Sequence, residues 1–312
     1  MLLNTQVLSL SCLSITGPDT HMKQSAAYPP GFVLISRGRT TIAVREEYRE
    51  LLLKQGIDSP EKLMDGCVIE DAAHMGRGVT PAIPIQGRDQ ERMVIRKYRR
   101  GGVLRFFIRD VYWGGQRPFR ELCVTTAALE KGIPTVSVLA AVTVRVAGPL
   151  YRGYFISREL PSSRDLPDVL GALAMSPAKE RFTKKRAILA QVARAIRSMH
   201  DRGFYHGDLN LKNVLIATHH EDRVYILDWD KSWYKEKPSQ AERSRNVLRF
   251  CRSMAKLKEK GFPITERDQL FFLRAYWGDD KSLMKRLRKD FMRMKLSLGV
   301  RKMRWKIEKL FD

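Results

Sequence analysis

Short apolar runs rich in β-branched residues, separated by glycine and proline, fill the chain from residue 28 to about residue 144. They include GFVLIS, TTIAV, MVIRKY and VSVLAAVTVRV. Runs of this kind, bounded by turn-forming residues, predict β-strands. One helix is expected among them, between Pro118 and Gly132, because proline is favoured in the first turn of a helix and glycine just after its end.

From about Ser162 onward the pattern becomes helical. The clearest helix is expected over residues 182–202, before the helix-stopping Gly203, and its apolar residues recur at helical spacing, namely Ile188, Val192, Ile196 and Met199. Strands followed by helices predict an α+β chain of two lobes with a cleft between them. We place the β-rich N-terminal lobe at residues 28–158 and the helical C-terminal lobe at residues 159–280, joined through YFISRELPSS.

The two ends of the chain differ from these lobes. Residues 1–27 open with a mildly apolar stretch that polar residues interrupt, and we expect them to be disordered or to include a mis-assigned start before Met22. Residues 281–312 carry twelve Lys or Arg against three acids, and apolar residues recur every three or four positions, namely Met284, Leu287, Phe291, Met294 and Leu298. This pattern predicts a basic amphipathic helix, which either packs on the body with a solvated basic side or lies on anionic lipid.

Charge is the strongest feature of the composition. The 312 residues carry a formal net charge of +23, which sets aside an acidic or purely solvating role and indicates an anionic partner: nucleic acid, a membrane surface, or a phosphorylated or acidic substrate. The four cysteines are scattered without a C-x-x-C pair, so neither a disulfide framework nor a zinc site is indicated. Eighteen consecutive apolar residues occur nowhere, so any membrane contact is expected to be peripheral.

The most specific chemical signal is YHGDLNLKNVLI, residues 205–216, followed by ILDWD, residues 226–230. It resembles the catalytic loop and metal-binding motif of the protein-kinase-like superfamily, H-x-D-x-x-x-x-N followed by D-x-G. Phosphoryl transfer needs a carboxylate to orient the acceptor hydroxyl and take its proton, and Asp208 supplies it. An amide oxygen and a second carboxylate, from Asn213 and Asp228, would hold Mg²⁺.

Details around this motif narrow the kind of kinase. His206 is grouped with the catalytic residues, as a buried, hydrogen-bonded support of the loop rather than a proton carrier. Protein serine/threonine kinases usually have lysine two residues after the catalytic Asp, whereas this chain has Asn210, as sugar and small-molecule kinases commonly do. The third residue of the metal motif is Asp230 instead of glycine, and no A-P-E motif follows before a helix near Ala241, so a peptide-binding platform is not expected.

The resemblance also implies a cation for the nucleotide phosphates. Laying V-A-I-K over residues 93–96 places Arg96 where most of the superfamily has lysine. A shift of one residue would place Lys97 there, and because adjacent side chains of a strand point to opposite faces, only one of the two can serve. We favour Arg96. Glu121, in the predicted helix that starts at Pro118, is the expected ion-pair partner of that cation.

Further nucleotide-binding candidates are weaker. Gly76 and Gly78 precede the cation-bearing strand by about the length of a hairpin, and they resemble a short glycine loop whose backbone N–H groups approach phosphates. Glu159, in the connection between the lobes, is also placed with the nucleotide-binding residues.

Taken together, five segments resemble the lipopolysaccharide kinase family, and within it the branch that phosphorylates 3-deoxy-D-manno-octulosonic acid (Kdo): YRRGG, PFRELCVTTAALEKGIPTVSVLAA, MHDRGFYHGDLNLKNVLI, ILDWDKS and SRNVLRFCRSMAKLK. The resemblance covers roughly residues 70–260. It implies a protein-kinase-like two-lobed fold and an enzyme that transfers the γ-phosphate of ATP, with Mg²⁺, to an inner-core sugar. The implied acceptor is a Kdo-bearing lipid A precursor, at the cytoplasmic face of the inner membrane, where the enzyme would be peripheral.

Such an acceptor would account for the charge, since it is anionic and sits in a membrane. Four arginines either bind its carboxylate or phosphate or form a solvated basic face: Arg99, Arg100, Arg105 and Arg109. Two alternatives remain. One is a kinase of the same fold acting on heptose, another small molecule or a protein. The other is a non-catalytic nucleic-acid-binding protein, but no helix-turn-helix, RNP or KH motif is recognisable, so nucleic acid is not expected as a partner.

Overall fold

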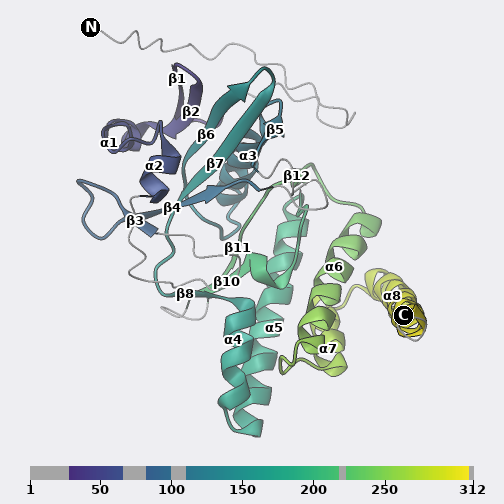
Figure 1. Ribbon diagram of the computed structural model, residues 1–312. Coiled ribbons are helices and arrows are strands. Elements are labelled where there is room, and N and C mark those ends of the chain that lie inside the picture. Colours follow the sequence, from purple (N-terminus) through teal and green to yellow (C-terminus); the bar gives the residue numbers. More distant parts are fainter. Residues whose placement is uncertain (1–27, 66–81, 100–109, 218–222, 309–312) are drawn as a thin grey trace, which may run out of the picture. The chain divides into compact units, whose positions relative to one another are not determined.

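The computed structural model describes residues 28–65, 82–99, 110–217 and 223–308 (Figure 1). The chain divides into two compact units. The first comprises Met1–Ser162 together with Asp228–Asp230, and the second comprises Ser163–Leu227 and Lys231–Asp312. The three-residue segment Asp228–Asp230 therefore belongs to the first unit, although its neighbours in sequence on both sides belong to the second.

An antiparallel sheet of seven strands, counted over the described residues, forms the core of the first unit. Its hydrogen-bonded order is β1-β2-β6-β7-β4-β3, and β5 pairs with the first residues of β7. The strands are β1 (Phe32–Arg37), β2 (Thr40–Arg45), β3 (Ala82–Pro84), β4 (Arg92–Lys97), β5 (Tyr112–Trp113), β6 (Val138–Ala147) and β7 (Leu150–Arg158). The four apolar runs named from the sequence lie in β1, β2, β4 and β6, so those predicted strands are confirmed.

Helices bury both faces of this sheet (Figure 1). On one face α1 (Arg49–Lys54) and α2 (Pro60–Asp65) pack over a cluster that includes Ile95 and Ile156. On the other face α3 (Arg117–Glu130) packs over a cluster that includes Phe155. Successive side chains of a strand point to opposite faces, which is why Phe155 and Ile156 belong to different clusters.

The predicted helix between Pro118 and Gly132 is confirmed as α3. Pro118 lies in its first turn, where a missing backbone N–H costs nothing, and Gly132 follows its end with a φ of 72°, a left-handed conformation that glycine adopts without strain.

The second unit contains five α-helices and two small sheets among its described residues. The helices are α4 (Leu166–Ala172), α5 (Ala178–Asp201), α6 (Gln240–Glu259), α7 (Glu266–Trp277) and α8 (Lys281–Glu308). One sheet joins β8 (Ser163–Asp165), β10 (Val214–Ala217) and β11 (Arg223–Ile226), and the other joins β9 (Phe204–Tyr205) to β12 (Trp233–Tyr234). The helix predicted over residues 182–202 is confirmed as α5, which starts earlier, at Ala178, and buries the four apolar residues expected to line it.

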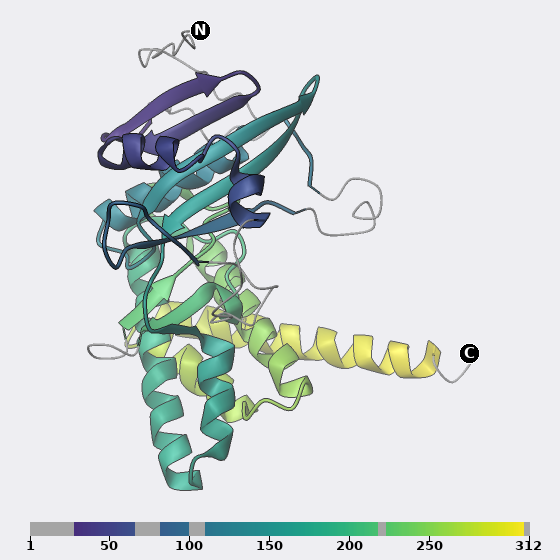
Figure 2. The same cartoon turned by 60° about the vertical axis from the view of Figure 1, so that its left-hand side comes forward.

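Helix α8, the basic helix expected near the C-terminus, packs against α6 and α7 and extends beyond them (Figure 2). Its packed side chains are Leu283, Leu287, Phe291 and Met294. Met284, which the sequence pattern placed in the apolar row, is instead 36% exposed, because Leu283 rather than Met284 continues the four-residue spacing of Leu287 and Phe291. Leu298 lies outside the described side chains. Of the two alternatives for this helix, the structure favours packing on the body for the part up to Met294.

Over the residues that the structure describes, none of the helices combines the length and the apolar character needed to cross a membrane.

The packing of α8 predicts a difference between two substitutions on the same helix. Leu287→Ala, at a fully buried position, should lower the free energy of unfolding by about 3 kcal/mol, the usual cost of truncating a buried leucine. Met292→Ala, at a position 56% exposed, should change it by less than about 0.5 kcal/mol. Urea unfolding followed by circular dichroism measures both, and equal small effects would show that α8 is not packed in solution.

Candidate active site

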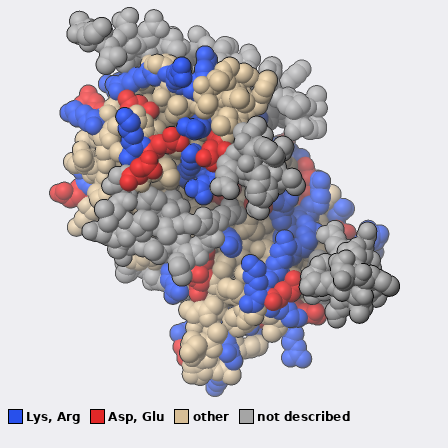
Figure 3. All heavy atoms as spheres, in the orientation of Figure 1, with Lys and Arg blue, Asp and Glu red and all other residues tan. Residues whose placement is uncertain are grey.

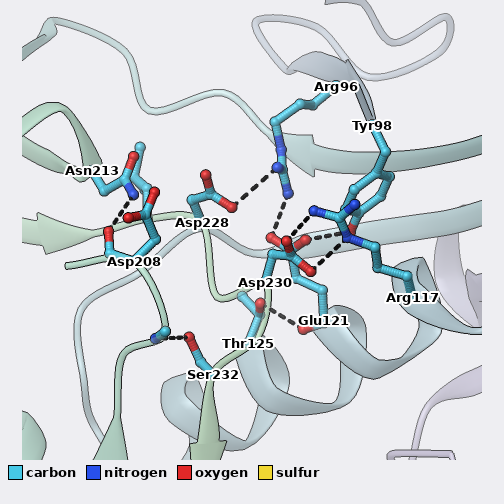
Figure 4. A network of polar contacts seen from close by, with 12 residues as sticks. Arg96, Tyr98, Arg117, Glu121, Thr125, Asp208, Asn213, Asp228, Asp230 and Ser232 are labelled. Atoms are coloured by element: carbon cyan, nitrogen blue, oxygen red, sulfur yellow. Dashed lines mark hydrogen bonds and ion pairs between the residues drawn. The ribbon is translucent and has the colours of Figure 1, made fainter. Parts of the chain in front are cut away.

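Arg96 lies in β4 with its side chain on the α3 side of the sheet, opposite Phe155 in the register of β7. Its Nη2 is 2.5 Å from Oε1 of Glu121, in α3, and its Nη1 is 3.1 Å from Oδ1 of Asp228 (Figure 4). The guanidinium also lies over the rings of Tyr98 and Phe155, 4.9 Å and 5.3 Å from their centroids. One arginine therefore links a strand, a helix and the metal motif of the first unit.

Glu121 is an acid inside the core, with 2% of its surface exposed. Its second carboxylate oxygen accepts a hydrogen bond from the Tyr98 hydroxyl, so both oxygens have partners. Burial raises the pKa of Glu121, and Arg96 opposes that rise. Burial lowers the pKa of Arg96, but Glu121 and Asp228 outweigh it and the net shift is upward, so the guanidinium stays charged.

Lys97, the alternative phosphate cation, points to the other face of the sheet. Its Nζ is 2.8 Å from Oε1 of Glu61, in α2, and 2.9 Å from Oδ2 of Asp110. This is the alternation expected of adjacent strand residues. The structure thus brings Arg96, and not Lys97, together with Glu121 and Asp228.

Each residue of the D-W-D motif contacts a different side chain of the first unit. Asp228 meets Arg96, the buried Trp229 donates from Nε1 to Oγ1 of Thr135 at 3.0 Å, and Asp230 pairs with Arg117 through both carboxylate oxygens (Figure 4). Asp228 has a φ of 64°, a left-handed conformation that aspartate tolerates better than most residues.

Arg117 begins α3 and is well suited to hold Asp230. Its Nε lies 2.8 Å from Oδ1 of Asp230, and its guanidinium lies over the rings of Tyr98 and Tyr112, 4.8 Å and 4.6 Å from their centroids. Burial lowers the pKa of Arg117, but the hydrogen bond and charge of Asp230 more than offset it and the net shift is upward. The acid that replaces the usual glycine of this motif therefore has a defined partner, which the sequence alone did not reveal.

The predicted catalytic loop lies in the second unit and runs from β9 into a single turn, Leu211–Asn213, that leads into β10. Asn213 donates from Nδ2 to the backbone oxygen of Asp208 at 2.8 Å (Figure 4). Asn210 donates to the same backbone oxygen at 2.9 Å and to Oδ2 of Asp208 at 3.2 Å, while its own side-chain oxygen accepts from the Lys212 N–H. Two asparagines that follow Asp208 along the loop therefore hold it in place.

His206 is fully buried, as expected of a support for this loop. Its Nε2 lies 2.9 Å from the backbone oxygen of Leu227, which can only accept, so the ring proton is on Nε2 and Nδ1 accepts the N–H of Asp208 at 3.2 Å. The next residue must be glycine, because a Cβ on Gly207 would lie 2.5 Å from the backbone oxygen of Lys231.

Helix α6 supports the catalytic loop with three polar residues on one side, at spacings of three and four. Asn246 donates to the backbone oxygen of His206 at 2.6 Å, Arg249 donates from Nη1 to Oδ1 of Asp208 at 2.9 Å, and the Ser253 hydroxyl accepts the Leu211 N–H at 3.3 Å. The segment SRNVLRFCRSMAKLK, which resembles the lipopolysaccharide kinase family, covers this helix, but none of the predicted site residues lies in it. The sequence signal for this role is the spacing of Asn246, Arg249 and Ser253, which places three polar residues in one row along the helix.

A buried histidine lies behind this support. Because the Asn246 amide nitrogen donates to His206, its oxygen accepts, and His200 donates to it from Nε2 at 3.0 Å. Nδ1 of His200 therefore accepts the Tyr276 hydroxyl at 2.7 Å. Burial lowers the pKa of His200 to about 4, so the ring is neutral in the folded protein at neutral pH.

Glu159 and Arg99 are the remaining candidates from the sequence that the structure describes. Glu159 directly follows β7 and lies beside Arg92, the first residue of β4: its backbone N–H donates to the backbone oxygen of Arg92 at 2.8 Å, and its carboxylate lies 3.5 Å from Nε of Arg92. Arg99 is exposed. The other candidates lie outside the described residues: Gly76, Gly78, Arg100, Arg105 and Arg109.

An antiparallel sheet followed by a helical region that carries this loop is a protein-kinase-like fold. A solved structure, "WaaP in complex with acyl carrier protein", shares it with a TM-score of 0.50 over 81% of this chain and 98% of that one, at 17% identity. A model of the Lipopolysaccharide kinase (Kdo/WaaP) family matches residues 77–276, and the chain belongs to that family. As a member of a kinase family it is a phosphotransferase, and membership implies ATP as the phosphate donor.

Two relatives of this chain carry a more specific name than that of the family. A 3-deoxy-D-manno-octulosonic acid kinase of Vibrio cholerae serotype O1 is 31% identical over 185 residues, which are 58% of this chain and 72% of the relative. A protein of the same name from Xylella fastidiosa is 30% identical over 188 residues, 59% of this chain and 70% of the relative.

The depressed pKa of His200 predicts how stability depends on pH. Between pH 6.5 and about pH 4 the unfolded chain takes up a proton on this ring that the folded chain does not, so the free energy of unfolding should fall as the pH falls, by up to about 3 kcal/mol. Urea unfolding at several pH values measures this slope. In His200→Gln this contribution should be absent, and an unchanged slope between pH 6.5 and 4 would contradict the assignment.

The contact between Arg117 and Asp230 predicts an energetic coupling. A double-mutant cycle with Arg117→Gln and Asp230→Asn should give a coupling of about 1–2 kcal/mol in the free energy of unfolding, because the pair is two-pronged and largely shielded from water. The control pair Arg37 and Asp58, which is more exposed and 3.3 Å apart, should give less than about 1 kcal/mol. Equal couplings would mean that Arg117 does not hold the motif.

Proposed function

We propose that this chain is an ATP- and Mg²⁺-dependent sugar kinase that phosphorylates Kdo on a lipid A precursor. The observation that carries the proposal is the catalytic loop, in which Asn210 and Asn213 both fix Asp208, in a chain that belongs to a lipopolysaccharide kinase family. The choice of Kdo rests on relatives named 3-deoxy-D-manno-octulosonic acid kinase, about 30% identical over some 70% of their own length.

Arg96 is the proposed ligand of the nucleotide phosphates. Glu121 and Tyr98 hold its guanidinium from one side, so the side chain is oriented before any nucleotide binds. The nitrogen that now meets Asp228 and the remaining N–H donors match the geometry of phosphate oxygens. Arginine thereby fills the role that lysine has in most of the superfamily.

Asn213 and Asp228 are the proposed metal ligands. Magnesium prefers oxygen and commonly takes one or two carboxylates together with substrate phosphates. The amide nitrogen of Asn213 donates to Asp208, so its oxygen is the atom left for a metal, and Asp228 contributes a carboxylate. Bound Mg²⁺ would neutralise negative charge on the phosphates.

Asp208 is the proposed base. It orients the acceptor hydroxyl and accepts its proton as the sugar oxygen bonds to the γ-phosphorus and the bond from that phosphorus to the bridging oxygen breaks, which releases ADP. Asn210 and Arg249 each bind one oxygen of the carboxylate, and His206 holds the backbone of the loop. The protein groups thus fix the base in position before the acceptor arrives.

A peripheral location at the cytoplasmic face of the inner membrane follows from this acceptor. The net charge of +23 and the exposed basic residues of α8 support it, since anionic lipid attracts such surfaces. The exposed basic residues are Lys281, Lys285, Arg286, Arg288, Lys289 and Arg293.

The central test of this proposal replaces the base. Asp208→Asn should lower transfer of labelled phosphate from ATP to a Kdo-bearing lipid A precursor by about a thousandfold, because general-base catalysis contributes on that order, while ATP still binds. The exposed Asp279→Asn is the matched control and should keep full activity. Mass spectrometry of the product identifies the sugar that carries the phosphate.

Undiminished transfer by Asp208→Asn would overturn the role of Asp208. Transfer by the unmodified protein to a heptose or a peptide, and not to Kdo, would overturn the proposed acceptor.

A further inference from the structure

A row of basic side chains follows one exposed side of α6. Arg245, Arg249, Arg252 and Lys256 are spaced by four, three and four residues, which places them on the same side of the helix, and all four are exposed. Figure 3 shows Lys and Arg atoms gathering over this helix. Asn246 and Ser253, which bind the catalytic loop, lie next to this row on the helix, and Arg249 belongs to both groups, so the basic row runs along the edge of the loop.

Arg249 connects this row to the proposed base. Its Nη1 is 2.9 Å from Oδ1 of Asp208, and the two side chains are 44% and 47% exposed. An ion pair as exposed as this contributes little to stability. The position of the pair indicates a role in binding instead, since the cation reaches the carboxylate that would orient the acceptor hydroxyl.

The guanidinium has capacity for a second anion. Arginine carries five N–H donors in a fixed planar arrangement, and only Nη1 is engaged with Asp208 among the described residues. Asn246 and Ser253 hold the helix against the loop on either side of Arg249, so the backbone of Arg249 is fixed while its charged end remains accessible to solvent.

We propose that Arg249 binds the acid group of the acceptor sugar whose hydroxyl Asp208 orients. This inference rests on the proposed function and narrows it, because it makes a carboxylate or phosphate close to the reacting hydroxyl a requirement for good acceptors. A guanidinium pairs with either group through parallel hydrogen bonds. Arg245 and Arg252, one turn away on either side, extend the same positive charge toward further anionic groups of the acceptor.

The test compares the affinities of two ligands for three forms of the protein in a thermodynamic cycle. Binding of free Kdo and of its methyl ester, which lacks the negative charge, is measured by calorimetry for the unmodified protein, Arg249→Gln and Arg249→Lys. Arg249→Gln should weaken binding of the acid about tenfold, the loss of a charge-assisted hydrogen bond, and leave binding of the ester unchanged. Arg249→Lys should recover part of the affinity for the acid, because it keeps the charge but not the planar arrangement of donors.

Lys258→Gln is the matched control. Lys258 is exposed on the opposite side of α6, so its removal changes the net charge equally and should leave the affinity for the acid as it was. The same comparison is then made for a Kdo-bearing lipid A precursor before and after phosphatase treatment. If Arg249→Gln weakens binding of the precursor only before phosphatase treatment, and weakens binding of neither free Kdo nor its ester, then Arg249 binds a phosphate, and this result would also support the site.

Two outcomes separate this inference from the proposed function. If Arg249→Gln weakens binding of the acid and of the ester by the same factor, or weakens neither of them and also leaves binding of the lipid A precursor unchanged, Arg249 recognises no acid group and the inference fails, even where Kdo is phosphorylated. If the acid binds with the expected dependence on Arg249 but is not phosphorylated by the unmodified protein, the proposed function fails and the anion site stands.

Discussion

A carboxylate buried between a sheet and a helix is the constraint on which the first unit depends. Glu121 is almost completely removed from water, and an ionised acid there is tolerated only with a cation and further hydrogen bonds. Arg96 and Tyr98 supply them, both from or next to β4. Because Arg96 also reaches Asp228, the requirement to neutralise Glu121 determines which residue of the strand faces the metal motif. A register shifted by one residue would put Lys97 on that side in place of Arg96, and it would also turn Tyr98 away from Glu121, because Arg96 and Tyr98 share one face of the sheet.

The second unit also holds a carboxylate in a defined position, but it does so with hydrogen bonds at the surface instead of a buried ion pair. Its loop carries Asp208, the proposed base, whose side chain is 47% exposed, so burial does not fix it. Backbone and side-chain hydrogen bonds from Asn210, Asn213 and His206 hold it instead, and α6 adds Asn246 and Arg249. The buried His200 and Tyr276 complete this support from behind, so the exposed part of the loop rests on buried side chains that are hydrogen-bonded to one another.

Much of this architecture could be predicted from local pattern. Alternation and turn residues predict the strands, Pro118 and Gly132 predict α3, and the spacing from Asp208 to Asn213 predicts the loop, because each of these signals is contained within a few neighbouring residues. The contacts of Arg249 and Arg117 could not be predicted, since they join residues 41 and 113 positions apart and depend on packing. The apolar row of α8 was misassigned at Met284 for a related reason. Leucine and methionine at adjacent positions are equally apolar, and only the facing helices select Leu283.

The chain enters the first unit a second time for only three residues, Asp228–Asp230, and both ends of that segment continue into the second unit. A fragment comprising residues 163–312 would therefore contain the D-W-D motif but lack Arg96, Thr135 and Arg117, and the almost fully buried Trp229 would lose its hydrogen bond to Thr135. A fragment ending at residue 162 would retain Arg96, Thr135 and Arg117 without the side chains of the motif that they contact. A cut between Ser162 and Ser163, although it falls at a boundary between the two units, would separate this motif from the residues that hold it.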